Sequence, residues 1–131
     1  MIIIACVDNN FGIQFNKRRQ SKDKEVIDRI YEITKNNRLF TTDFSKNLFE
    51  KEKIIICDKV PQDAYADDYF FVESPELCDF SKVDKVILFC WNTVYPCDLK
   101  FVLPSNFRVA KSSDFEGNSH KKITEVYYEK V

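Results

Sequence analysis

Four short apolar runs mark the expected strands in the first two-thirds of the chain. Each run is rich in β-branched or aromatic residues and is bounded by polar turn residues, a pattern typical of strands buried on both faces of a sheet. The runs cover residues 2–7, 53–57, 69–72 and 86–91. Because the first run contains no polar residue, we expect a central strand at the start of the chain.

One segment between the first two runs has the periodicity of a helix instead. Its apolar residues recur at i, i+1, i+4 and i+7, which places them on one helical face; they are Val26, Ile27, Ile30 and Ile33. Ser21 is in position to cap this helix, Asp23 and Glu25 favour its first turn, and Asn36 marks its end. The preceding residues, 15–20, are polar and aperiodic, and they are expected to form a loop.

The last third of the chain predicts strands with no helix between them. Strand-like stretches cover residues 99–103, 107–110 and 123–129, and a polar turn at residues 117–122 separates the last two. Strands joined by short turns pair antiparallel. The predicted fold class is therefore α/β: a three-layer domain whose mainly parallel central sheet carries antiparallel C-terminal strands. No linker or repeat is visible, so residues 1–131 are expected to form a single domain.

Composition and charge narrow the range of partners. The 131 residues include 20 lysines and arginines and 21 aspartates and glutamates, for a net charge of −1. This balance gives no general attraction to a polyanion, so extended nucleic-acid binding is not expected. No apolar run approaches the roughly 20 residues that cross a bilayer, and we expect no membrane partner. Two glycines, Gly12 and Gly117, are too few for the glycine-rich loops that hold nucleotide phosphates.

Cysteine and histidine content bears on redox state and metal binding. The five cysteines are odd in number, scattered and mostly set in apolar stretches. This pattern is typical of buried thiols in a reducing cytoplasm, so a cytoplasmic location is expected. The chain has one histidine, His120, whereas zinc motifs such as H-E-x-x-H need two. No metal site is therefore expected.

Both ends of the chain resemble dihydrofolate reductase. In that family an apolar strand is followed by Ala, an acid or Asn pair, and Gly-Ile; here residues 3–7 lead into Asp8-Asn9-Asn10-Phe11-Gly12-Ile13. The family's last strands are similar to Lys85-Val86-Ile87-Leu88, to Asp98-Leu99-Lys100-Phe101 in a D-x-x-F pattern, to residues 107–115 with Gly117, and to residues 123–129. The resemblance implies a dihydrofolate reductase-like fold with a substrate cleft beside the loop after the first strand.

The motifs that this family uses for substrate and cofactor are replaced. Arg18-Arg19-Gln20-Ser21 stands where the family has Leu-Pro-Trp before its acid, with Asp23 the nearest acid here. Phe89 replaces the threonine that bonds that acid, and residues 41–45 replace the Gly-Arg-x-Thr turn for the cofactor's 2′-phosphate. The family's Gly-Gly pair is missing. We therefore expect a divergent member of the family that lacks standard NADPH-dependent folate reduction. No cofactor is expected, and NADPH is left open as the alternative.

Two polar segments carry the candidate binding residues. The first is suited to bind a phosphate, carboxylate or nucleotide through guanidinium and amide groups; its candidates are Asn16, Arg18, Arg19, Gln20 and Ser21. The second is expected to pack against the first, and its candidates are Trp91, Asn92 and Tyr95. A solvated loop and a core tryptophan are the simpler alternatives.

The candidate catalytic groups are Asp23 and His120. Asp23 is considered as a general acid, although the other acids of the same helix serve equally well for solubility. His120 is considered because histidine is the side chain that ordinarily titrates near neutral pH. A histidine in a polar turn is also a common surface residue, and that alternative stays open.

These residues suggest three functions. The leading one is the binding of a small anionic or nucleotide-like molecule in the residual cleft. The first alternative is a non-enzymatic protein or RNA interaction module that uses the loop from Lys17 to Lys24. The second alternative is an altered NADPH-dependent oxidoreductase that uses Asp23. A homodimer that pairs through the C-terminal hairpin at the sheet edge is also left open.

Overall fold

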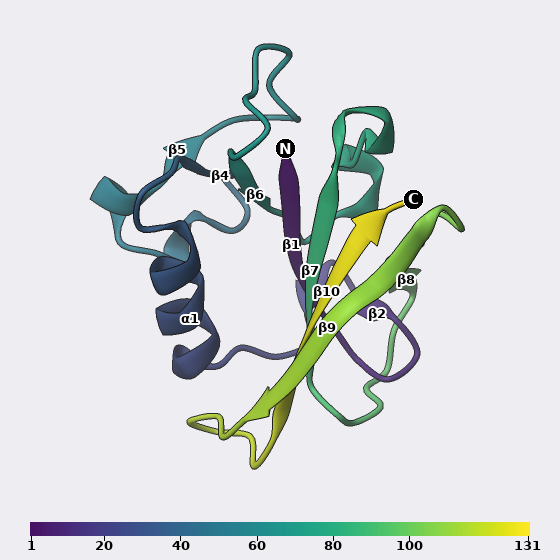
Figure 1. Cartoon of the computed structure of the whole chain (residues 1–131). Coiled ribbons are helices and arrows are strands. Elements are labelled where there is room, and N and C mark those ends of the chain that lie inside the picture. The colour runs from purple at the N-terminus through teal and green to yellow at the C-terminus, as the bar shows by residue number, and fades with distance from the viewer.

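The structure, a computed structural model, describes residues 1–131 and contains two sheets and one α-helix (Figure 1). The helix is α1 (Lys24–Thr34), and four short 3₁₀ turns cover Lys46–Leu48, Lys51–Lys53, Pro75–Leu77 and Phe80–Lys82. The strands are β1 (Ile2–Val7), β2 (Gly12–Phe15), β3 (Arg18–Arg19), β4 (Leu39–Thr41), β5 (Ile55–Ile56), β6 (Tyr69–Phe71), β7 (Lys85–Cys90), β8 (Leu99–Lys100), β9 (Phe107–Phe115) and β10 (Ile123–Lys130). The larger sheet has the order β5-β4-β6-β1-β7-β10-β9, and the smaller one β3-β2-β8.

Strand β1 lies at the centre of the larger sheet, as its unbroken apolar sequence predicts. It pairs in parallel with β6 on one side and with β7 on the other, so that Ile4 lies opposite both Phe71 and Ile87. Its alternate side chains enter two separate cores, with Ile4 on the side of α1 and Ile3 on the opposite side. The mainly parallel α/β architecture expected from the sequence is confirmed in this respect.

The C-terminal strands form the antiparallel hairpin that their spacing predicts. Strand β10 pairs antiparallel with β7 and with β9, with a bulge between Tyr127 and Tyr128. Residues 117–122 make the connection between β9 and β10, and β9 is the edge of the sheet. The homodimer expected through this edge stays a prediction.

Helix α1 covers one face of the larger sheet. Val26 and Ile30 are buried against Ile4 and Phe89 of the sheet, in agreement with the apolar periodicity. The expected cap is wrong by two residues: Asp23, not Ser21, caps the helix, and its side chain accepts a hydrogen bond from the Glu25 N–H. The helix begins at Lys24, so Asp23 is the residue directly before it, and the side chain of Ser21 bonds to His120.

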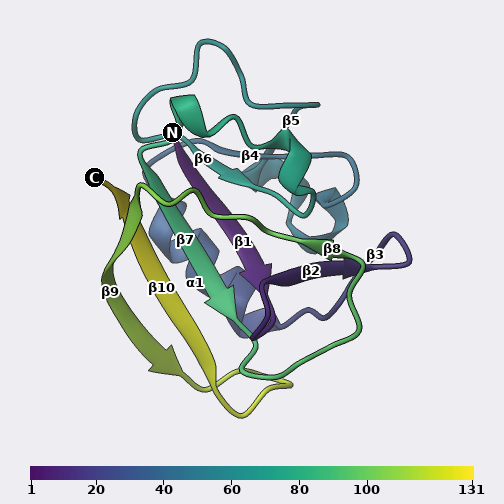
Figure 2. The same ribbon diagram turned by 90° about the vertical axis from the view of Figure 1, so that its right-hand side faces the viewer.

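The opposite face of the sheet is covered without an α-helix (Figure 2). Its core is closed by β2 and by loop residues, with Ile13, Val60, Val83 and Phe101 packed around Ile3. Loops and 3₁₀ turns cover this face because they carry large apolar side chains, Phe80 and Phe101 among them, that pack into the core.

Three local expectations are also corrected. Residues 53–57 do not form a buried strand: only Ile55–Ile56 is a strand, and both side chains are exposed because β5 lies at the sheet edge. Residues 15–20 are not a loop but the hairpin β2–β3, whose turn has positive φ at Asn16 and Lys17, as a two-residue type I′ turn requires. Strand β8 joins β2 rather than the C-terminal hairpin. No helix is both long and apolar enough to cross a membrane.

Candidate functional site

The candidate site lies at the carboxyl ends of the parallel strands. Asp8 follows β1, Glu73 lies just beyond β6, and Trp91 follows β7. Ligands of open α/β sheets bind just outside the carboxyl ends of the strands, because loops from several neighbouring strands meet there. The polar residues of the sequence are therefore concentrated where a binding site is expected.

Asp8 holds three loops together at the carboxyl ends of the strands. Its buried carboxylate accepts hydrogen bonds from the backbone N–H groups of Asn10, Gly12 and Tyr95 and from Nε2 of Gln20. Burial alone would raise the pKa of Asp8, but these hydrogen bonds lower it below its ordinary value. Asp8 thereby brings the segment that contains Gln20 against the one that contains Tyr95, as expected from the sequence.

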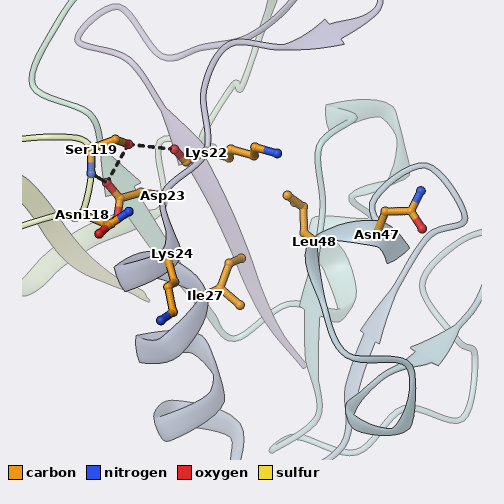
Figure 3. A pocket seen from close by; sticks show the side chains of 8 residues that line it. All are labelled: Lys22, Asp23, Lys24, Ile27, Asn47, Leu48, Asn118 and Ser119. Carbon is orange, nitrogen blue, oxygen red and sulfur yellow. Dashed lines mark hydrogen bonds between the residues drawn. The ribbon is translucent and has the colours of Figure 1, made fainter.

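Asp23 joins the start of α1 to the loop between β9 and β10. Its buried carboxylate accepts hydrogen bonds from the N–H groups of Asn118 and Ser119, at 2.8 and 2.9 Å, besides the cap bond from Glu25 (Figure 3). Burial favours a raised pKa for Asp23, but these bonds and one from His120 lower it well below its ordinary range. The side chain is therefore an ionised acceptor at neutral pH, which does not fit a general acid.

His120 lies between Asp23 and Ser119 on its Nδ1 side and two further hydroxyl groups on its Nε2 side. Oγ of Ser119 is 3.2 Å from Nδ1. The same Nδ1 is 2.8 Å from Oδ2 of Asp23, and Nε2 is 2.9 Å from Oγ of Ser21 and 3.3 Å from the Tyr95 hydroxyl. The imidazole stacks on the buried ring of Trp91, with centroids 4.5 Å apart. The histidine is thus fixed in orientation by contacts on its face and on both of its nitrogens.

Glu73 is the centre of a second polar cluster. Arg19 donates two hydrogen bonds to its carboxylate, from Nε and Nη2, each 2.9 Å long, and the Ser45 hydroxyl donates a third. The side chain of Gln14 donates to the Glu73 carbonyl oxygen. Because this ion pair holds the guanidinium, the pKa of Arg19 is raised, and Arg19 is committed to a partner inside the protein.

Arg18, the neighbouring residue, lies in a different environment. It is exposed, forms no ion pair, and lines a cavity of about 500 Å³. The remaining lining residues are Phe15, Asn16, Arg19, Gln20, Tyr95 and Pro96. Oε1 of Gln20 is buried and has no hydrogen-bond partner. The cavity therefore offers one free cation, and one of its lining residues carries a buried acceptor without a partner.

A second cavity, of about 380 Å³, is lined by residues that follow Ser21 in the chain and by two other loops. Residues from the loop before α1, the helix itself, the 3₁₀ turn and the hairpin loop line it: Lys22, Asp23, Lys24, Ile27, Asn47, Leu48, Asn118 and Ser119 (Figure 3). Lys22 and Lys24 are both exposed and form no ion pair. Lys22 extends toward the side formed by Asn47 and Leu48, whereas Lys24 lies along the helix.

The structure divides the sequence-derived candidates into three groups. Asn16, Arg18, Gln20 and Tyr95 line the first cavity. The second group, Ser21, Asp23 and His120, forms a hydrogen-bonded row, with Tyr95 also reaching it. The third group serves the protein itself: Arg19 pairs with Glu73, Trp91 is buried under His120, and Asn92 donates to the Lys122 carbonyl and to Thr124.

Three residues that matter at this site were missed from the sequence: Asp8, Glu73 and Ser119. Asp8 was detectable, because an Asp followed by Asn-Asn-Phe-Gly is typical of a side chain that caps its own turn. Glu73 is a lone acid just after a buried strand, which predicts a position at the carboxyl edge. Ser119 gives no such signal, since its contact with Asp23 joins residues 96 positions apart.

The sequence matches no protein-family model, and no curated protein is significantly similar to it. No group of three or more histidine, cysteine, aspartate or glutamate side chains is arranged to hold a metal ion. The function must therefore be inferred from the cavities and from the polar clusters beside them.

Proposed function

We propose that this chain is a divergent dihydrofolate reductase-like domain that binds a small anionic or nucleotide-like molecule without standard NADPH-dependent folate reduction. One observation carries the proposal: Arg18 and Gln20 line the same cavity, and neither the Arg18 guanidinium nor the buried Oε1 of Gln20 has a partner within the protein. Buried polar groups in proteins are nearly always hydrogen-bonded, so an unsatisfied one beside a cavity favours a ligand.

The contrast between the two adjacent arginines supports an anionic ligand. Arg19 has its charge neutralised by Glu73, whereas Arg18 is a planar cation with every donor free. Guanidinium groups bind phosphates and carboxylates with two parallel hydrogen bonds. Arg18 is the side chain that would bind the anion, and Asn16 and Tyr95 add polar groups around it.

The other walls of the cavity support a nucleotide-like ligand. Oε1 of Gln20 accepts hydrogen bonds, so its complement is an N–H or O–H donor such as a base or sugar carries. Phe15 is exposed at the rim, where an aromatic ring provides a surface on which a base stacks. A ligand with an anionic end and a flat polar end would satisfy all three groups.

Two features support a member that has lost the reductase chemistry. Phe89, at the position of the family's threonine, is fully buried between the sheet and α1, with its ring edge against Phe115. Gly12 and Gly117 are packed against neighbouring atoms, and a Cβ on either would lie within 3 Å of them, so neither provides an open cradle for a cofactor. The parallel sheet with its antiparallel C-terminal hairpin agrees with the fold that the resemblance implies.

Thermal-shift and calorimetric titrations with inorganic phosphate, AMP, NADPH and dihydrofolate test this proposal. We expect phosphate or AMP to stabilise the wild type, and Arg18→Ala to weaken that binding at least about tenfold, since a charged hydrogen bond contributes roughly 1.5–3 kcal/mol. Arg108→Ala is the matched control, because Arg108 is exposed on β9 and forms no ion pair. Absence of stabilisation by any anion, or equal losses in both variants, would contradict the proposal.

The interaction-module alternative also has an observation in its favour. Lys17, Arg18, Lys22 and Lys24 are all exposed, and none forms an ion pair, so the loop from Lys17 to Lys24 is a local basic surface. RNA binding through this surface would weaken steeply with salt and would involve Lys17 as much as Arg18. Equal losses for Lys17→Ala and Arg18→Ala would favour this alternative over the cavity.

A further inference from the structure

Asp23, His120 and Ser21 form a continuous row of hydrogen bonds between two distant parts of the chain. Oδ2 of Asp23 lies 2.8 Å from Nδ1 of His120, and Nε2 of His120 lies 2.9 Å from Oγ of Ser21. A serine, a histidine and a buried carboxylate in this order are the parts of an acyl-transfer site, which is recognised by geometry and not by sequence position. We propose that Ser21 is a nucleophile, activated by His120, for the hydrolysis of small carboxylic esters.

The protons in this row are arranged for that chemistry. An ionised carboxylate only accepts hydrogen bonds, so Nδ1 of His120 carries the proton toward Asp23. Nε2 then presents its lone pair to the hydroxyl of Ser21. This is the tautomer in which a histidine removes the proton of a serine, and the carboxylate of Asp23 stabilises the imidazolium that forms.

The histidine ring is held rigidly in this orientation. Trp91 stacks on one face of the imidazole with an interplanar angle of 23°. Asp23 is in turn fixed by the N–H groups of Asn118 and Ser119, so it acts as a positioning residue. A base that is already aligned with its nucleophile needs no reorganisation during the reaction. The Tyr95 hydroxyl also reaches Nε2, but at 3.3 Å it is the more distant of the two donors.

Ser21 lies in the chain between two residues that line different cavities, although its own side chain lines neither. It is partly exposed, its neighbour Gln20 lines the first cavity, and its neighbour Lys22 lines the second. Lys22 has no ion-pair partner, but its side chain extends toward Asn47 and Leu48, so it would have to turn toward Ser21 to stabilise the negative charge that develops on a carbonyl oxygen. An ester with a carboxylate on its acyl group would also be attracted to Arg18.

The proposed reaction balances without any further reagent. Oγ of Ser21 attacks the carbonyl carbon while Nε2 of His120 takes the hydroxyl proton. The carbon–oxygen bond to the alcohol then breaks, and the alcohol leaves with the proton from Nε2. Water next attacks the acyl-serine, gives a proton to Nε2, and releases the carboxylic acid as Ser21 recovers its proton. The nucleophile does not depend on which ligand occupies the Arg18 cavity.

Covalent labelling tests the nucleophile directly. The folded protein is treated with a fluorophosphonate probe, and the modified residue is located by peptide mass spectrometry. We expect one adduct, on Ser21, and a slow hydrolysis of p-nitrophenyl acetate that the adduct abolishes. An unlabelled protein, or a label on any other residue such as Ser119, would overturn the proposal.

Two variants and a control separate catalysis from structure. Ser21→Ala should remove both labelling and hydrolysis, and His120→Gln should slow both by about 100-fold or more, the typical contribution of a general base. Ser112→Ala is the matched control, because Ser112 is an exposed serine on β9, outside the row. Hydrolysis by Ser21→Ala at the wild-type rate would contradict the proposal, and so would full labelling of a folded His120→Gln.

A second ester distinguishes this inference from the proposed ligand site. Succinic acid mono-p-nitrophenyl ester carries the carboxylate that p-nitrophenyl acetate lacks. If Arg18→Ala slows only the succinate ester, both the nucleophile and the anion site are supported. If Ser21 is labelled but Arg18→Ala leaves both esters unaffected, the nucleophile stands and the anion site fails.

Discussion

The carboxylates of Glu73 and Asp23, both near the carboxyl ends of the parallel strands, have different hydrogen-bond partners. Glu73 accepts two hydrogen bonds from Arg19 and one from Ser45, and all of these partners belong to fixed parts of the protein. Asp23 is equally well satisfied by backbone N–H groups and by the Ser119 hydroxyl, but its remaining partner is His120. One cluster therefore ends in a neutralised ion pair, and the other continues through the imidazole to Ser21.

The difference between these clusters indicates which of them does chemistry. A permanently charged guanidinium beside a carboxylate cannot give up a proton, so the Glu73 cluster can only position β2, β3 and the loop that contains Ser45. A neutral imidazole has one nitrogen that donates and one that accepts, so it can pass a proton between its partners. A buried carboxylate with all of its hydrogen bonds made is not by itself the sign of a reactive site. What matters is whether one of its partners is a group that can transfer a proton.

The largest expected effect is on stability at Glu73. Glu73→Gln removes the negative charge of a buried ion pair and leaves the Arg19 guanidinium without a counter-charge. We therefore expect a loss of about 3 kcal/mol in the free energy of unfolding. Urea denaturation followed by tryptophan fluorescence measures this loss. His120→Gln, in the other cluster, should cost only about 1 kcal/mol, a typical hydrogen-bond contribution.

A double-mutant cycle with Arg19→Ala is the control for this prediction. Residues that share a buried ion pair should show a coupling free energy of about 1–3 kcal/mol. If Glu73→Gln and Arg19→Ala are additive, the Glu73 cluster is not the closed ion pair described here, and the comparison with Asp23 fails.

A smaller effect is expected at the hairpin loop that carries His120. A Cβ at Gly117 would lie 2.7 Å from Oδ2 of Asp23 and 2.7 Å from the carbonyl oxygen of His120. Gly117→Ala should therefore displace the loop, at a cost of about 2 kcal/mol, as for other overpacked sites. Labelling of Ser21 should fall in the same variant, and labelling at the wild-type rate would show that the row tolerates the movement.

A further effect depends on pH and concerns Asp23. Its folded-state pKa lies below the ordinary value of 3.8, so its charged hydrogen bonds stabilise the fold fully above that value, and this stability is lost as the pH falls through the folded-state pKa. Asp23→Asn should cost about 1.5 kcal/mol at pH 7, since asparagine still caps helices but carries no charge.

Urea midpoints at pH 7 and at about pH 2.5 test this dependence. The difference between wild type and Asp23→Asn should be largest at pH 7 and should shrink at the acidic pH, because Asp23 of the unfolded chain then binds a proton while the folded protein still holds it ionised. A difference that grows as the pH falls would have the wrong sign and would mean that Asp23 is not held as an ion.

Local sequence was sufficient to predict the elements whose apolar periodicity indicates which side chains are buried. The unbroken apolar run of β1 predicts a central strand, the stripe through Val26 and Ile30 predicts α1, and the spacing of the last strands predicts the hairpin. Each follows from a periodicity within one element. Ile55 and Ile56 show the limit of such reasoning, because an apolar strand at the edge of a sheet has the same local pattern as a buried one.

The sequence by itself therefore determined a mainly parallel α/β sheet and the polar character of residues 15–23. Only the tertiary structure decided what those polar residues do. Arg18 and Arg19 are neighbours of the same type, yet one meets Glu73 and the other meets a cavity. Ser21 and Asp23 meet His120 across 99 and 97 positions, and no local pattern encodes such a contact because it arises from where two separate loops pack.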